Sequence, residues 1–389
     1  MTGGIALNKR KVYNKRLKKI VMLSSFLTVI GLILLNSKSL QISTFIREDK
    51  TLNTENTSEI SKYQLLLENV FDSRNKAILT KDDEVLKKLY DTDHKFGLWA
   101  YEHEVTKMKY LENWSAKQGV KFNDIKTRVK VKKVKEKEEN LYGIICTVST
   151  EYNYSYENQP DIKNMFRIGT YHYLNMNIID NEYIITKEWY TDPFADSMHL
   201  DNIKSEDIKN YILSKEKQEI NLTEEQKKGI EYAHKFCGAA ADEEYGMKFN
   251  PKYKDFNPDG GDCANYASQI MFESGRFKKN QTWNYEDNSG TKAWVNAQGF
   301  KNYILNSGRG SLISKGSYEQ TYKHAYNLRP GDFVAYEKSG RITHVSTVTG
   351  LDTKGYPLVT CHNTDRLLVP WDLGWSNKDI KFHFIKVHY

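Results

Sequence analysis

A diglycine turn that delivers a cysteine to the start of a helix is the feature that most constrains this chain. Gly260 and Gly261 allow backbone angles that residues with a side chain resist. After Cys263 the apolar residues recur at intervals of three and four, which predicts a helix that Gly275 is placed to end. The positive end of the helix dipole would favour the Cys263 thiolate and make the sulfur a better nucleophile. The alternative interpretation is a buried structural cysteine.

The first 36 residues have the pattern of an export signal. Basic residues precede an uncharged run from Ile20 to Leu35, which places the N-terminus inside the cell and the bulk of the chain outside. The run is at the short end for a membrane span and long for the core of a cleaved signal. No A-x-A cleavage site follows it. We therefore expect an uncleaved, single-pass signal-anchor in the cell membrane, with secretion after cleavage as the alternative.

The charge of the chain is concentrated in the same region. Residues 1–50 carry +8, whereas the whole chain carries +7, so the remainder is close to neutral. A nucleic-acid-binding role would need a basic patch in the folded part, so the composition argues against a nucleic-acid partner.

The period of the apolar residues divides the rest of the chain. Helical spacing from residue 60 to about 119 gives way to strict alternation from residue 125, which predicts helices followed by an antiparallel sheet. This α+β order resembles that of cone-shaped NTF2-like domains. The predicted segments are a basic cytoplasmic tail (1–19), a signal-anchor transmembrane helix (20–36), a linker (37–59), an α+β accessory domain (60–195), a connecting segment (196–222) and a second α+β domain (223–389).

The second domain contains a predicted hairpin that carries two histidines. One strand includes His344 and the next includes His362, on either side of a turn around Thr353. If the hairpin is symmetric about Thr353, His344 lies directly opposite His362 on one face of the sheet, and Asn363 points to the other face. A helix packed on this sheet would present Cys263 to the two imidazoles.

Cysteine on a helix, histidine on a strand and a polar residue on the next strand is the chain order of papain-like peptidases and amidases. Residues 225–385 resemble a specific family, the putative amidase domain of Gram-positive exported proteins, which is related in plan to papain-like and NlpC/P60 enzymes. The resemblance is carried by Tyr232-Ala233, Asn250-Pro251, Tyr253, Phe256, the run 260–269, Trp283, Tyr285, 293–295, 328–332 and 343–345.

The resemblance implies a catalytic site. Cys263 would attack a carbonyl carbon, His344 would act as the base, and the backbone N–H of Cys263 would stabilise the oxyanion. Family members often read His-Thr where this chain has a longer segment after Cys361, so the third catalytic residue is His362, Asn363 or Asp365, and the strand pairing favours His362. Candidate substrate-binding residues are Asp262, Tyr266, Gln269, Trp283 and Trp294, although an aromatic core is the alternative for the aromatic ones.

An exported amide hydrolase would meet peptidoglycan first, so the predicted function is a cysteine-dependent amidase or endopeptidase acting on peptidoglycan or another extracellular amide, with no cofactor. A non-catalytic papain-like module that binds wall polymer or peptide is the alternative. A zinc site built from Cys263, His344, Cys361 and His362 is disfavoured, because the spacing lacks a C-x-x-C knuckle and adjacent strand residues point to opposite faces.

Overall fold

The computed structural model describes residues 57–179, 182–195, 197, 206–375 and 379–389, and residues 58–389 form one compact unit. The described helices are α2 (Thr57–Thr80), α3 (Asp83–Lys87), α4 (Lys95–Gln118), α5 (Glu206–Leu213), α6 (Glu224–Lys235), α7 (Cys263–Glu273), α8 (Lys292–Val295), α9 (Ala297–Asn306) and α10 (Tyr318–Ala325), with short 3-10 helices η2 (Gly238–Ala240), η3 (Glu243–Tyr245) and η4 (Asn257–Asp259). The described strands are β1 (Val120–Glu138), β2 (Leu141–Tyr156), β3 (Gln159–Ile179), β4 (Glu182–Tyr190), β5 (Tyr285–Glu286), β6 (Ser289–Gly290), β7 (Gly310–Gly316), β8 (Phe333–Lys338), β9 (Arg341–Leu351), β10 (Pro357–Cys361), β11 (Asp365–Pro370) and β12 (Ile380–Val387).

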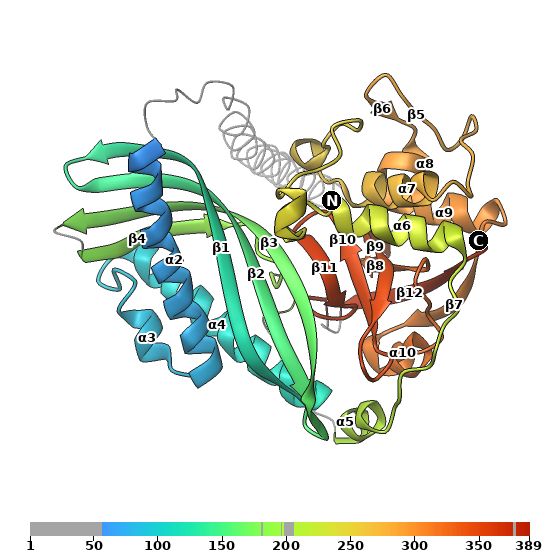
Figure 1. The fold of residues 1–389 in the computed structure, drawn as a ribbon, viewed down its shortest axis with the longest axis horizontal. Coiled ribbons are helices and arrows are strands. Elements are labelled where there is room, and N and C mark those ends of the chain that lie inside the picture. Colours follow the sequence, from blue (N-terminus) through green and yellow to red (C-terminus); the bar gives the residue numbers. More distant parts are fainter. Residues whose placement is uncertain (1–56, 180–181, 196, 198–205, 376–378) are drawn as a thin grey trace, which may run out of the picture. The chain divides into compact units, whose positions relative to one another are not determined.

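One antiparallel sheet of ten strands runs through both halves of this unit (Figure 1). Its order is β1-β2-β3-β11-β10-β9-β8-β12-β7, and β4 pairs with β3 beside this path. β3 is the joining strand, because residues 167–169 pair with β11 and residues 172–179 pair with β4. The α+β content agrees with the sequence, and the strands of the two predicted domains belong to one continuous sheet.

The structure also differs from the expectation of a membrane-anchor helix. Within the part of the chain that the structure describes, no helix combines the length and the apolar composition needed to cross a membrane. The predicted signal-anchor segment at 20–36 lies outside the described residues.

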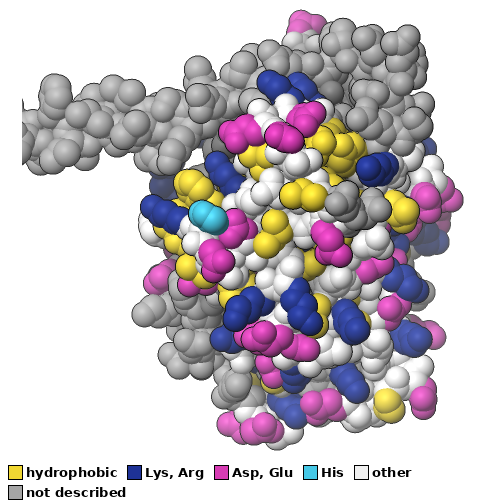
Figure 2. Space-filling view, turned by 90° about the vertical axis from the view of Figure 1, so that its left-hand side faces the viewer, with side chains coloured by type: hydrophobic (Ala, Val, Ile, Leu, Met, Phe, Trp, Pro, Cys, Tyr) yellow, Lys and Arg dark blue, Asp and Glu magenta, His cyan; other side chains and the backbone are white. Residues whose placement is uncertain are grey.

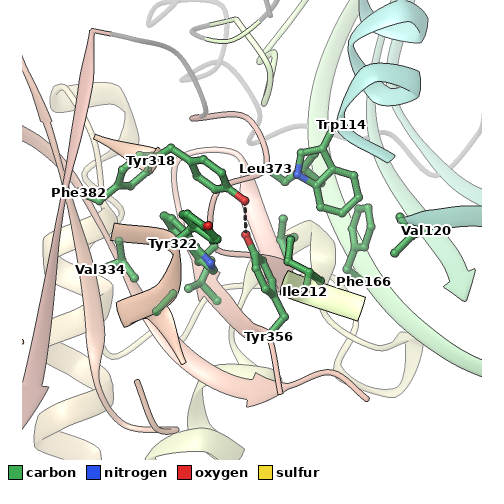
Figure 3. Packing of buried hydrophobic residues seen from close by; sticks show 14 of the residues in the cluster. Trp114, Val120, Phe166, Ile212, Tyr318, Tyr322, Val334, Tyr356, Leu373 and Phe382 are labelled. Atoms are coloured by element: carbon green, nitrogen blue, oxygen red, sulfur yellow. Dashed lines mark hydrogen bonds between the residues drawn. The ribbon is translucent and has the colours of Figure 1, made fainter. Parts of the chain in front are cut away.

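The largest hydrophobic core is shared by the two halves (Figure 3). Trp114 from α4 and Phe166 from β3 belong to the same buried cluster as Tyr318 from α10 and Phe382 from β12. A buried carboxylate strengthens this junction, because Asp372 accepts hydrogen bonds from the Trp114 indole N–H at 3.1 Å and the Tyr356 hydroxyl at 2.8 Å. The N-terminal half is therefore part of the core that supports the C-terminal half.

The turn between β9 and β10 is held by the same junction. The Asp352 carboxylate accepts hydrogen bonds from the hydroxyls of Tyr154, at 3.1 Å, and Tyr156, at 2.5 Å. Within the turn, the Gly355 N–H donates to the Asp352 carbonyl. The turn predicted near Thr353 is confirmed, and two tyrosines of β2 fix the position of the hairpin.

Two layers of helices enclose the C-terminal part of the sheet. Apolar side chains of α7, α8 and α9 pack on the face formed by Phe333, Ala335 and Val345, whereas α10 packs with Val334 on the opposite face. Figure 2 shows the side of the molecule at the left of Figure 1, where Lys and Arg side chains are interspersed with Asp and Glu and with hydrophobic side chains among the described residues.

Candidate functional site

The start of α7 has the geometry that the sequence predicts. Gly260 and Gly261 have φ values of 114° and 135°, in the region that favours glycine, and α7 begins at Cys263. A Cβ on Gly261 would lie 2.2 Å from the side-chain nitrogen of Asn363. The diglycine turn therefore allows the loop after β10 to approach the helix start closely.

The Cys263 thiol lies against strand β9, next to the predicted base. Its sulfur accepts a hydrogen bond from the backbone N–H of Val345, the residue that follows His344. Only 5% of Cys263 is exposed, and this burial raises the pKa of its thiol to about 12 despite the Val345 hydrogen bond. Burial therefore opposes the thiolate that the sequence predicts at the start of α7.

His344 is a buried, neutral imidazole. Its Nε2 lies 3.1 Å from the Ser346 hydroxyl and 3.3 Å from the Cys361 sulfur. Its ring stacks on Trp375 with centroids 4.9 Å apart. Burial, helped by the positive charge of Arg366, lowers the pKa of His344 to about 3. The ring is therefore in the form that can accept a proton.

The predicted opposition of His344 and His362 is wrong. A register shift between Leu358 and Val359 pairs Thr360 with Thr347, and β10 ends at Cys361. The observed pairing of β9 with β10 is thus offset by one residue from the predicted pairing, and His362 lies beyond the end of β10.

His362 binds the turn before α7. Its Nδ1 lies 2.6 Å from the Asp262 carboxylate and its Nε2 lies 2.8 Å from the Phe236 carbonyl oxygen. Both partners are acceptors, so both ring nitrogens donate and the ring is an imidazolium. Burial opposes the charge, but the hydrogen bond and charge of Asp262 outweigh it and raise the pKa of His362. Tyr266 stacks on the ring with centroids 3.6 Å apart.

The other candidates for the third residue also hold loops. The Asn363 side-chain oxygen accepts a hydrogen bond from the Asp262 N–H at 2.6 Å. The Asp365 carboxylate accepts from the Ala239 N–H at 2.7 Å, and burial raises its pKa to about 6. The structure brings His362 and Asn363 to the Cys263 turn and brings none of the three side chains to a hydrogen bond with His344.

The five candidate substrate-binding residues, Asp262, Tyr266, Gln269, Trp283 and Trp294, are all buried. The two indoles donate to polar side chains of α7, Trp283 to Ser268 at 3.0 Å and Trp294 to Asn265 at 2.9 Å. The Gln269 amide oxygen accepts from the Tyr232 hydroxyl at 2.7 Å. In this state they fix α7 against its neighbours, and contact with a substrate stays a prediction.

Sequence reasoning missed the side chains that surround His344. Ser346 follows His344 by two positions in a strand, and this spacing alone places both on one face of the sheet. Cys361 was considered only as a zinc ligand, but the four residues of that alternative divide into two groups, since Cys361 contacts His344 whereas His362 binds Asp262. Trp375 gave no signal, because its approach to His344 depends on the long loop after β11.

A family comparison matches the part of the chain that contains Cys263 and His344. Residues 223–385 match the model of a family described as "Putative amidase domain". The chain is 33% identical over 139 residues to the protein YjcM of Bacillus subtilis (strain 168), described as uncharacterized, and this match spans 33% of the chain and 30% of that relative. A solved structure, the intermembrane space region of the chloroplast protein ARC6, matches 33% of this chain and 95% of its own with 12% identity and a TM-score of 0.23.

Proposed function

We propose that this protein is a cysteine-dependent amide hydrolase in which Cys263 is the nucleophile and His344 is the base. The observation that carries the proposal is the position of the Cys263 sulfur at the start of α7 and against the Val345 N–H, one residue from His344. The match of residues 223–385 to the amidase-type family supports the reaction class.

The proposed reaction proceeds through a thioester. His344 takes the Cys263 proton as the sulfur attacks the carbonyl carbon of the amide, and backbone N–H groups at the start of α7 stabilise the negative oxygen. The amide C–N bond then breaks, and His344 gives its proton to the leaving amine. Water attacks the thioester, releases the acid and restores the thiol.

The resting pair is uncharged in this proposal. The pKa of Cys263 is raised to about 12 and that of His344 is lowered to about 3, so thiol and neutral imidazole are the stable forms near neutral pH. Proton transfer must therefore accompany attack on the substrate. This differs from a site that holds a preformed thiolate–imidazolium pair.

We further propose that the protein is exported and that the amide belongs to peptidoglycan. The basic residues before the apolar run at 20–35 and the near-neutral charge of the remainder support this setting. Both the amide between sugar and stem peptide and the bonds within the peptides fit the chemistry.

The test compares the full-length wild type with Cys263→Ala on purified Gram-positive cell walls, with released fragments identified by mass spectrometry. New amine ends that are produced by the wild type and lost in Cys263→Ala are the expected result. Cys146→Ala, which removes a buried thiol from the core of the N-terminal half, is the matched control and should remain active. Equal release by Cys263→Ala and wild type would contradict the proposal.

A binding module is the second candidate. The burial of both groups favours it, because only 5% of Cys263 and 3% of His344 are exposed. In that case the wild type would sediment with cell walls without releasing fragments, and Cys263→Ala would sediment to the same extent.

A further inference from the structure

Among the described residues, the polar contacts of the His344 ring lie at Nε2, while Trp375 and Tyr336 pack against the ring. Its Nε2 has two neighbours, the Ser346 hydroxyl at 3.1 Å and the Cys361 sulfur at 3.3 Å. Exposure of the three residues is 3% or less, so water does not compete for these contacts. Ser346 belongs to β9 and Cys361 is the last residue of β10, so two neighbouring strands fix the ring.

The neighbours of Ser346 determine where its hydroxyl proton is donated. The Tyr336 hydroxyl donates to the Trp371 carbonyl at 2.8 Å, which leaves the Tyr336 oxygen as an acceptor. The Ser346 hydroxyl has two acceptors nearby besides His344, the Tyr336 oxygen and the Cys361 sulfur, and it has a single proton to give. With its proton on either of these acceptors, Ser346 has its lone pairs free to accept from the Nε2–H of His344.

A neutral imidazole carries one proton, so a donor at Nε2 makes Nδ1 the basic nitrogen. The Cys361 sulfur is also able to accept from Nε2, and its own chemical environment includes the buried cation of Arg366, its cross-strand partner. Cys361 also contributes to the electrostatic environment of Cys263, so the two thiols and the imidazole belong to one neighbourhood.

We propose that Ser346, supported by Cys361, is the positioning residue of this site and fixes His344 as the tautomer with its proton on Nε2. The inference rests on the proposed function, since it explains how Nδ1 is kept free to receive the Cys263 proton. A hydroxyl and a thiol thus take the place that His362, Asn363 or Asp365 would fill.

Neutral partners have a chemical consequence. A carboxylate would stabilise an imidazolium at rest, whereas Ser346 and Cys361 orient the ring without adding a negative charge, and Arg366 disfavours the charged ring. The arrangement keeps His344 neutral until the Cys263 proton is transferred.

The first measurement reads the tautomer directly. Full-length protein labelled with 15N-histidine would be studied by long-range 1H–15N correlation NMR at about pH 7, and His344→Gln would assign the His344 signals among the ten histidines. The wild type should show a protonated Nε2, and the double variant Ser346→Ala, Cys361→Ala should show a mixture of tautomers. A protonated Nδ1 in the wild type, or an unchanged tautomer in the double variant, would overturn the proposal.

The second measurement is kinetic. Ser346→Ala should lower kcat for release of wall fragments by about 10-fold to 100-fold with KM unchanged, a loss as large as that caused by removing the partner that orients a metal-binding histidine. Ser346→Thr keeps the hydroxyl and should restore most of the rate. Ser149→Ala is the matched control, because Ser149 is an equally buried strand serine whose hydroxyl has no hydrogen-bond partner among the described residues.

The two measurements separate the two proposals. If the wild type releases no wall fragments but its His344 carries the Nε2 proton and loses this preference in the double variant, the hydrolase proposal fails and the positioning by Ser346 stands. If wall fragments are released and Ser346→Ala is as active as Ser149→Ala, the hydrolase proposal stands and the role of Ser346 is wrong.

Discussion

At the scale of single residues, burial makes the reactivity of the Cys263 thiol strongly dependent on pH. Because its pKa is raised to about 12, alkylation by iodoacetamide should be slow at neutral pH and should rise about tenfold per pH unit in alkali. Mass spectrometry of the peptide that contains Cys263 would follow the rate. A plateau already reached near neutral pH would indicate a thiolate stabilised by the helix dipole and would contradict this expectation.

The imidazolium of His362 makes stability depend on pH in the opposite direction from an ordinary carboxylate. Its pKa is raised above the unfolded value, so its contribution is complete below about pH 6.5 and is lost as the pH rises through the folded-state pKa. Asp262→Asn removes the charge that sustains it and should lower the free energy of unfolding at about pH 6 by about 3 kcal/mol.

Urea unfolding of wild type and Asp262→Asn across this pH range would measure the effect. The difference between the two proteins should shrink as the pH rises, since the wild type loses its imidazolium. A difference that stays constant with pH would show that His362 is not charged.

At the scale of elements, the close approach of the β10–β11 loop to α7 can be tested at the diglycine turn. Gly261→Ala introduces a Cβ that would lie 2.2 Å from the Asn363 side chain, whereas a Cβ on Gly260 meets nothing within 4 Å. Both substitutions strain the backbone by about 1–3 kcal/mol, but only Gly261→Ala should also displace Asn363 from the Asp262 N–H. We expect Gly261→Ala to be the more destabilising change.

A double-mutant cycle isolates this contact. Asn363 has a φ of 66°, so Asn363→Gly is compatible with the backbone and removes the group that clashes. Adding Asn363→Gly to Gly261→Ala should recover part of the lost stability, whereas adding it to Gly260→Ala should not. Additive effects in both pairs, measured by denaturant unfolding, would contradict the proposed clash.

Local elements were predictable where short-range chemistry determines them. Thr223 and Gln226 have the spacing of a capping box and form one with both reciprocal hydrogen bonds, and α7 begins at Cys263. The pairing of His344 with His362 fails because the hairpin is centred on Lys354 rather than on Thr353, and the register shift after Leu358 only partly offsets this difference.

At the scale of the whole molecule, the shared core predicts that the two halves unfold together. Lys117 of α4 forms a buried ion pair with Asp372, with side-chain exposures of 2% and 0%. Lys117→Met leaves that carboxylate without its charged partner and should lower the free energy of unfolding by about 3–5 kcal/mol. Hydrogen exchange in peptides from residues 60–190 and from 223–389 should report the same loss.

A surface pair provides the control. Lys81 and Glu112 form an ion pair whose side chains are 61% and 44% exposed, so Lys81→Met should change stability by less than about 1 kcal/mol. If Lys117→Met lowered protection only in peptides from one half, the halves would be separate cooperative units and the shared core would not couple them.

The α+β composition and the order of helices and strands follow from the periodicity of the chain, but the continuous sheet does not. Three residue pairs between β3 and β11 join segments far apart in the sequence, and strand alternation specifies which side chains are buried without specifying which strand lies alongside. The polar contacts of Asp352 and Asp372 with the N-terminal half could not be predicted from local sequence patterns either, because they form only when the halves are packed together.

The pairing of β3 with β11 also bears on how such a chain is assembled from transferable modules. Backbone groups of Asp365 to Leu367 would form an unprotected sheet edge if residues 223–389 stood alone, and open edges invite pairing with other chains. A relative that carries only this segment would need a substitute strand, a short or charged edge, or a second copy of itself. Recombination that separates residues 223–389 from β3 would thus cause aggregation even if the residues of the proposed site were unchanged.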